Sequence, residues 1–182
     1  MIAKETPFAR TVRWVGLLLF PTLIALAFVL SQLSRRRVIL FLSSFSFQTS
    51  LIGWLYLLTR NPYLGQFSTR YLSFVALVWM IALANLETNV AERVFNELLH
   101  YAHPLCVTLY WNLNPVYLPG VRVWLIGLLY PLSYFFFMLF INHWIGYELY
   151  PVLSTSPILV LSLFVIIEVL YWNAHQSTLN KS

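Results

Sequence analysis

Two stretches of the sequence carry polar side chains at helical spacing within apolar runs. In the first, small residues recur three and four positions apart and would form one stripe on a helix: Ser43, Ser46, Thr49, Ser50 and Gly53. In the second, Asn96, His100 and His103 fall on one helical face. Glu97 lies three residues before His100, where its carboxylate would orient the imidazole. In lipid, such polar faces should point into the interior of a helical bundle.

A hydroxyl beside a histidine can act as a nucleophile. The histidine takes the hydroxyl proton, and the oxygen then attacks an acyl carbon. Ser46 and Thr49 are the candidate hydroxyls, and His100 is the candidate base. Structural roles compete with this interpretation, because a hydroxyl often bonds a carbonyl of its own helix and a histidine can link two packed helices.

Histidine can also bind a metal ion or haem. His100, His103 and His143 would supply three nitrogens for zinc, and His100 with His143 could hold a haem. However, the sequence has no H-E-x-x-H motif and no aspartate, and its first two candidate ligands are three residues apart rather than four. We therefore expect no metal and no cofactor. Phosphate-loop, G-x-S-x-G and nucleic-acid motifs are also absent, so nucleic acid is not an expected partner.

The composition is that of an integral membrane protein. The 182 residues are 60% hydrophobic and only 9% charged, whereas soluble domains are about one quarter charged. Six apolar runs each approach the roughly 20 residues that cross a bilayer. They cover about 13–33, 38–58, 71–88, 96–113, 123–144 and 156–173. We predict an all-α fold: a polytopic membrane bundle of six transmembrane helices, formed by one domain over residues 1–182.

The eleven Lys and Arg residues predict the orientation of this bundle. If they lie in loops and at helix ends, one side of the membrane holds seven: Lys4, Arg10, Arg13, Arg60, Arg70, Arg122 and Lys181. The other side holds the remaining four: Arg35, Arg36, Arg37 and Arg93. The positive-inside rule then places both termini on the more positive, inner face.

The polar residues of three runs fall in the same leaflet of the predicted bundle. With a rise of about 1.5 Å per residue, Ser46 lies roughly 12 Å into the second run and His100 roughly 6 Å into the fourth. Both runs begin on the four-charge side, and His143 lies at the end of the fifth run on that same side. A shared pocket in one leaflet is therefore geometrically possible.

The order and spacing of several motifs from about residue 40 onward carry a family resemblance. The motifs are Phe45–Ser50 (FSFQTS), Asn96–His100 (NELLH), Tyr130–Tyr134 (YPLSY), Asn142–Gly146 (NHWIG) leading to Tyr150-Pro151, and Glu168–Leu170 (EVL). Together they resemble the androgen-induced-gene membrane proteins, which include the androgen-dependent regulator of tissue factor pathway inhibitor, and a related bacterial family of six-span proteins. 

The resemblance implies an intramembrane hydrolase that uses one threonine and one histidine to cleave fatty acid esters of hydroxy fatty acids. The family histidine matches His100, and the family threonine falls on Ser46, so serine replaces threonine here. Thr49 is the fallback nucleophile. Supporting roles, in orienting the base or binding the oxyanion, fall to Gln48, Asn96, Glu97 and His143.

Two departures from the family pattern keep another role open. Serine stands at the threonine position, and the loop after the fourth run has Tyr110-Trp111 where bacterial relatives have an acidic residue. The alternative is a non-catalytic accessory or scaffold subunit of a larger membrane complex, and a third option is a lipid- or haem-binding module. The expected partners are membrane lipids and, for the accessory role, other subunits.

Overall fold

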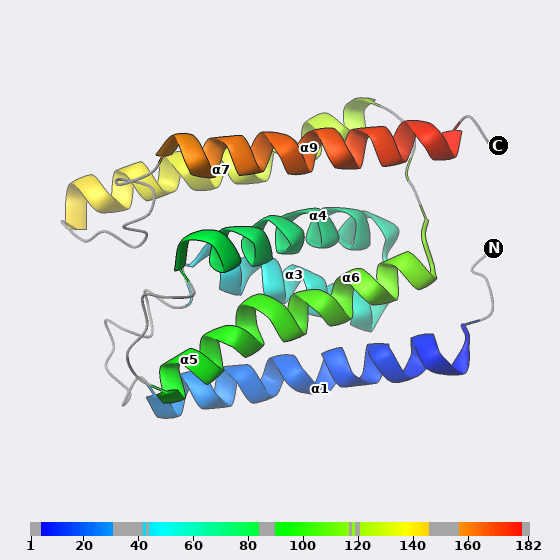
Figure 1. Ribbon diagram of the computed structural model, residues 1–182, viewed down its shortest axis with the longest axis horizontal. Helices are drawn as coiled ribbons and strands as arrows, with labels where there is room; N and C mark the ends of the chain where they lie inside the picture. Colours follow the sequence, from blue (N-terminus) through cyan, green and yellow to red (C-terminus); the bar gives the residue numbers. More distant parts are fainter. Residues whose placement is uncertain are drawn as a thin grey trace. The chain divides into compact units, whose positions relative to one another are not determined.

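The computed structural model describes residues 5–30, 42, 44–83, 90–116, 118, 121–145 and 157–179 (Figure 1). These residues form helices and, within the described ranges, no strand, which confirms the predicted all-α class. The helices are α1 (Pro7–Leu30), α3 (Phe45–Thr59), α4 (Pro62–Val78), α5 (Val90–Glu97), α6 (His103–Leu113), α7 (Val121–Ile145) and α9 (Pro157–Leu179), with π-helical turns η1 (Trp79–Leu83) and η2 (Leu98–Ala102).

Each predicted apolar run overlaps a helix, but the helices differ in their fitness to cross a membrane. Among the described residues, Pro7–Val29 is the one helical segment both long and apolar enough to span a bilayer by length and composition. Val123–Met138 and Ser162–Asn173 are apolar but shorter. The six-span arrangement therefore stays a prediction. Residues Arg35–Arg37, on which the predicted orientation partly depends, lie outside the described residues.

The third helix begins earlier than predicted, and this corrects the placement of one arginine. Asn61 caps α4, because its Oδ1 accepts hydrogen bonds from the backbone N–H groups of Tyr63 (2.9 Å) and Leu64 (3.4 Å). Pro62 follows at the first helical position, where its fixed φ suits a helix start. Arg70 thus lies inside α4 and is 2% exposed, rather than in a loop as the charge count assumed.

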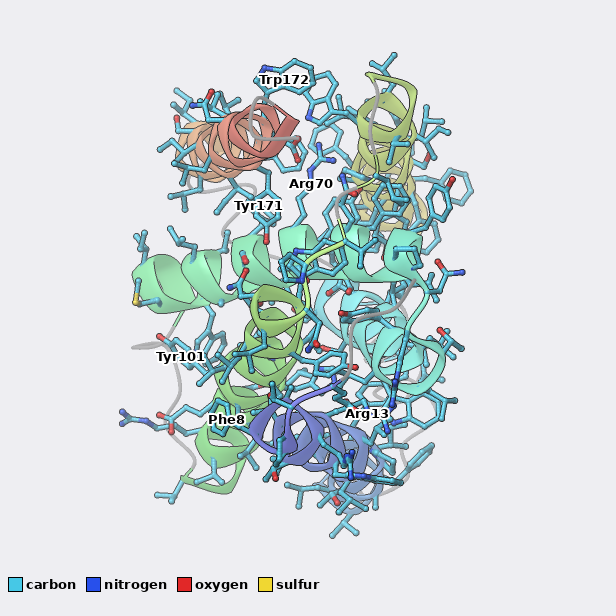
Figure 2. All side chains as sticks on the ribbon, turned by 90° about the vertical axis from the view of Figure 1, so that its right-hand side faces the viewer. Phe8, Arg13, Arg70, Tyr101, Tyr171 and Trp172 are labelled. Carbon is cyan, nitrogen blue, oxygen red and sulfur yellow. The ribbon has the colours of Figure 1, made fainter. Side chains whose placement is uncertain are left out.

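The described helices group into two compact units, residues 1–116 and residues 117–182. In the first unit, α1 and the α5–η2–α6 segment lie side by side and run in opposite directions (Figure 1). Leu23 and Ala27 of α1 pack against Phe95 and Leu99 in a buried cluster. Phe8 and Tyr101 lie on the outside of this unit (Figure 2).

Helix α3 is packed tightly against α4 and α6 in the first unit. Gly53 permits this approach: a Cβ there would lie 2.9 Å from Leu72 Cδ1 and 3.0 Å from Val107 Cγ2. One turn further on, the rings of Tyr56 and Tyr110 contact each other, with centroids 5.6 Å apart. The contacts Gly53–Val107 and Tyr56–Tyr110 follow each other in the same order along both helices, so α3 and α6 run parallel.

An ion-pair cluster joins the start of α1 to the turn between α3 and α4. Glu5 Oε2 accepts a hydrogen bond from Arg60 Nη2 at 2.9 Å, and Glu5 Oε1 lies 3.4 Å from Arg13 Nε. Arg60 ends α3 in the left-handed conformation, with φ of 57°. The Glu5 side chain is largely buried, and the neighbouring arginines offset the charge of a carboxylate that water barely reaches.

The second unit contains α7 and α9. Trp124 of α7 and Trp172 of α9 pack edge to face, with ring centroids 5.5 Å apart. The rings of Tyr134 and Phe137, one turn apart on α7, have centroids 5.9 Å apart. The expectation of a single domain over residues 1–182 remains a prediction.

Candidate functional site

Ser46 and His100 come together in the interior of the first unit. Ser46 Oγ lies 3.0 Å from His100 Nε2, a hydrogen-bond distance between residues 54 positions apart in the sequence. The two residues are 6% and 8% exposed. The structure therefore brings together the two side chains that the sequence selected as nucleophile and base, in a contact that links α3 to η2.

The second ring nitrogen of His100 fixes which nitrogen carries the proton. Nδ1 lies 2.8 Å from the backbone carbonyl oxygen of Asn96. Because a carbonyl oxygen only accepts hydrogen bonds, Nδ1 must be protonated and donate to it. In the neutral ring Nε2 is then unprotonated and accepts the hydroxyl hydrogen of Ser46. This is the tautomer that a general base for Ser46 requires.

Local helix geometry places His100 for this contact. Residues Leu98–Ala102 form a π-helical turn, and the His103 N–H bonds the carbonyl of Leu98, five residues earlier. Pro104 follows and has no N–H, so the carbonyl of His100 lacks its regular helical donor. A widened turn of this kind often marks a functional site, because it redirects side chains away from the regular helical positions.

The indole of Trp79 forms one wall of the site. Its ring is stacked on the His100 imidazole, with centroids 4.4 Å apart and planes 12° from parallel. Trp79 is buried and begins η1, the π-helical turn that follows α4. No sequence motif includes Trp79. The signal that could have found it is weak: an aromatic residue near the end of a polar-faced helix.

Thr49, the fallback nucleophile, is bonded to its own helix. Its Oγ1 hydroxyl lies 2.8 Å from the Phe45 carbonyl and 3.2 Å from that of Ser46, and it donates to these backbone acceptors. The residue is fully buried. Ser44, one residue before α3, accepts a hydrogen bond from the Phe47 N–H and caps the helix. Ser46 thus lies in the first turn of α3.

Among the predicted supporting residues, Asn96 contacts the ring of His100 through its main chain, by the carbonyl described above. Glu97 does not take the expected place: its Oε1 pairs with Arg93 Nε at 3.0 Å, on an exposed surface. The reason is helical spacing, because residues four apart share a face. The structure thus gives the orientation of His100 to a backbone carbonyl instead of a carboxylate.

The other predicted residues have these positions. Gln48 follows Ser46 by two positions and so points from another side of α3. His143 is exposed near the end of α7, in the second unit, and its supporting role stays a prediction. His103 is completely buried against Phe20, with ring centroids 5.3 Å apart. In the described part of the chain, no three His, Cys, Asp or Glu residues cluster as a metal site requires.

The arrangement has the parts of a minimal acyl-transfer site. A hydroxyl is hydrogen-bonded to an imidazole nitrogen that can take its proton, and the opposite nitrogen is held by a fixed acceptor. A backbone carbonyl stands where the triad of serine hydrolases has a carboxylate. Comparison with protein-family models gives no match, and comparisons with curated proteins and with solved structures give none either. 

Proposed function

We propose that the chain is a six-span integral membrane hydrolase that cleaves a lipid ester, of the type formed between a fatty acid and a hydroxy fatty acid. The observation that carries this proposal is the 3.0 Å contact between Ser46 Oγ and His100 Nε2 in a buried setting. Intramembrane ionisable side chains are costly and usually functional. The family resemblance, in which a hydroxyl and a histidine at these positions act together, supports the same reaction.

The outer surface supports the membrane setting of the proposal. Large apolar side chains are exposed along helices of both units, for example Leu18, Val29, Phe136, Phe140, Ile158 and Leu170. Lipid-facing helices expose many large apolar side chains, which water-soluble monomers keep to small patches. A substrate dissolved in the same bilayer would reach the site without crossing water.

The reaction follows from the hydrogen bonds of the site. Ser46 Oγ attacks the ester carbonyl carbon while His100 Nε2 takes the hydroxyl proton. The tetrahedral intermediate collapses, the bond to the alcohol oxygen breaks, and His100 returns the proton to that leaving oxygen. Water then attacks the acyl-Ser46 ester with His100 again as base. The products are a free fatty acid and the hydroxy fatty acid, and both residues are regenerated.

The start of α3 suits the negative charge that develops in this reaction. Ser46 lies in the first turn, where backbone N–H groups have no partner within the helix and the helix dipole is positive. Ser44 Oγ accepts the N–H of Phe47, and the N–H of Ser46 belongs to the same first turn. A donor on the nucleophile's own residue can bind the oxyanion of the tetrahedral intermediate.

The test is labelling by a fluorophosphonate probe, which reacts with activated serine hydroxyls, followed by mass-spectrometric mapping of the modified residue. The full chain in lipid nanodiscs should be labelled at Ser46 and should hydrolyse a fatty acid ester of a hydroxy fatty acid. Ser46→Ala and His100→Gln should each abolish both signals. Ser50→Ala is the matched control, because this fully buried hydroxyl lies one turn further along the same face of α3.

The results also distinguish a hydrolase from a non-catalytic accessory subunit. If Thr49→Ala loses activity and Ser46→Ala keeps it, the nucleophile is misassigned. If the intact chain neither reacts with the probe nor cleaves any lipid ester, the hydrolase proposal is wrong. The chain would then be better explained as an accessory subunit, in which the Ser46–His100 hydrogen bond joins two helices. 

A further inference from the structure

The buried indole of Trp79 lies flat on the imidazole of the proposed base. The 4.4 Å separation and the 12° angle describe a stacked pair, in which one whole face of the His100 ring is covered. The two rings come from η1 and η2, two separate π-helical turns. This stacked contact is made by the histidine that bonds the Ser46 hydroxyl, so a role beyond filling space is worth testing.

A positive charge supplies the reason. When His100 accepts the Ser46 proton, a neutral ring that is 8% exposed becomes an imidazolium. Serine hydrolases place a carboxylate beside that cation. Here Nδ1 bonds the Asn96 carbonyl, and Glu97, the nearest acid in sequence, is paired with Arg93. Within the described residues, no carboxylate is hydrogen-bonded to His100, so the charge needs another partner.

We propose that Trp79 is the positioning residue of this site: its indole face holds the His100 ring and stabilises the imidazolium formed when Ser46 is activated. The inference rests on the proposed hydrolase function. Tryptophan has the most electron-rich face among the aromatic side chains, and the attraction of a cation to that face grows when water is excluded. Loss of the Trp79 indole should slow hydrolysis by roughly tenfold to thirtyfold.

The indole has a competing use that the test must separate. Trp79 Nε1 is buried and has no hydrogen-bond partner among the described residues. Its N–H could therefore donate to the substrate oxyanion instead, which would make the edge of the indole important and not its face. The two roles respond oppositely to fluorine on the ring, because fluorine withdraws electrons from the face and makes the N–H more acidic.

The experiment is to replace Trp79 in the full chain with tryptophans carrying one to four ring fluorines, by nonsense suppression, and to measure lipid-ester hydrolysis. The turnover number should fall stepwise with each fluorine, and KM should stay constant. Trp79→Phe should retain more activity than Trp79→Leu, which has no aromatic face. A rate that is unchanged or rises along the series would overturn the inference. Trp54 is the control position, since its Nε1 donates to the Leu17 carbonyl.

A second readout does not depend on hydrolysis. The ¹⁹F resonance of 5-fluorotryptophan at position 79 should shift in one step as His100 is titrated, and His100→Gln should abolish that step. A resonance that ignores His100 refutes the inference. If hydrolysis proceeds but fluorine has no effect on it, only this inference fails. If the chain hydrolyses nothing while the resonance still follows His100, the proposed function fails and the indole–imidazolium contact is retained.

Discussion

Gly53 of α3 lies directly against Val107 of α6. A Cβ on this glycine would meet Val107 Cγ2 at 3.0 Å and, on the other side, Leu72 Cδ1 at 2.9 Å. The absence of a side chain therefore sets the distance between α3 and α6, two turns beyond Ser46. Because His100 lies in η2, which continues directly into α6, packing at Gly53 and the geometry of the Ser46–His100 contact are coupled.

Gly53→Ala should push α3 away from its neighbours. Overpacking of this size costs about 1–3 kcal/mol in the free energy of unfolding. Thermal denaturation in detergent should show the loss, and probe labelling of Ser46 should slow. Adding Val107→Ala to the variant should recover part of both, because the substitutions share one space and their effects are not additive. Equal losses in the single and double variants would contradict this account.

Glu5→Gln should weaken the attachment of α1 to the α3–α4 turn. The substitution removes the charge that Arg60 and Arg13 share; the Glu5 side chain is largely buried, whereas Arg60 is partly exposed. The expected loss in unfolding free energy is about 1–3 kcal/mol, between the values for surface and buried pairs. Glu97→Gln is the control and should cost less than about 1 kcal/mol, because its pair with Arg93 is exposed. Equal costs would show that burial of Glu5 is unimportant.

Asn61→Ala should destabilise the start of α4. It removes the Oδ1 acceptor of the Tyr63 and Leu64 N–H groups, and loss of a helix cap costs about 0.5–2 kcal/mol. Asn61→Ser keeps a capping oxygen and should restore most of the difference. Denaturation midpoints of the three proteins would measure this, and a serine variant as unstable as the alanine variant would argue against capping.

Ser46→Ala and His100→Gln should fail as one unit. If the hydroxyl and the imidazole act in the same step, either substitution removes the whole step. The double variant should therefore be no slower than the slower single variant. Initial rates of lipid-ester hydrolysis give the comparison. If the rate losses of the two single variants multiply in the double variant, His100 contributes to hydrolysis independently of Ser46.

The Ser46–His100 pair can be predicted from the sequence because two independent signals agree on it. Helical rise placed both side chains in one leaflet, and the family resemblance matched the same positions. The start of α4 was missed although Asn61-Pro62 is a cap followed by the residue that favours a first helical turn. The apolar run itself begins only at residue 71, whereas helix formation depends on backbone bonding and tertiary packing as well as on apolar character.

The surroundings of the pair could not be predicted in the same way. A period of 3.6 residues cannot reveal where a helix widens, so neither π-helical turn was foreseen. Glu97 was expected to orient His100 from spacing alone, but Arg93 competes for it at the favourable distance of four residues. Trp79 lies in a different helix from both partners, and the contact it makes is a product of the tertiary fold.

Because Leu98–Ala102 forms a π-helical turn, the number of residues in this segment matters to the site as much as their identity. A π-helical turn holds one residue more than α-helical bonding needs, and each residue rotates an α-helix by about 100°. Deletion of one residue from this segment would restore an unbroken α-helix and turn everything upstream out of phase with α6. The segment should therefore accept an apolar replacement of Leu98 more readily than any single-codon deletion.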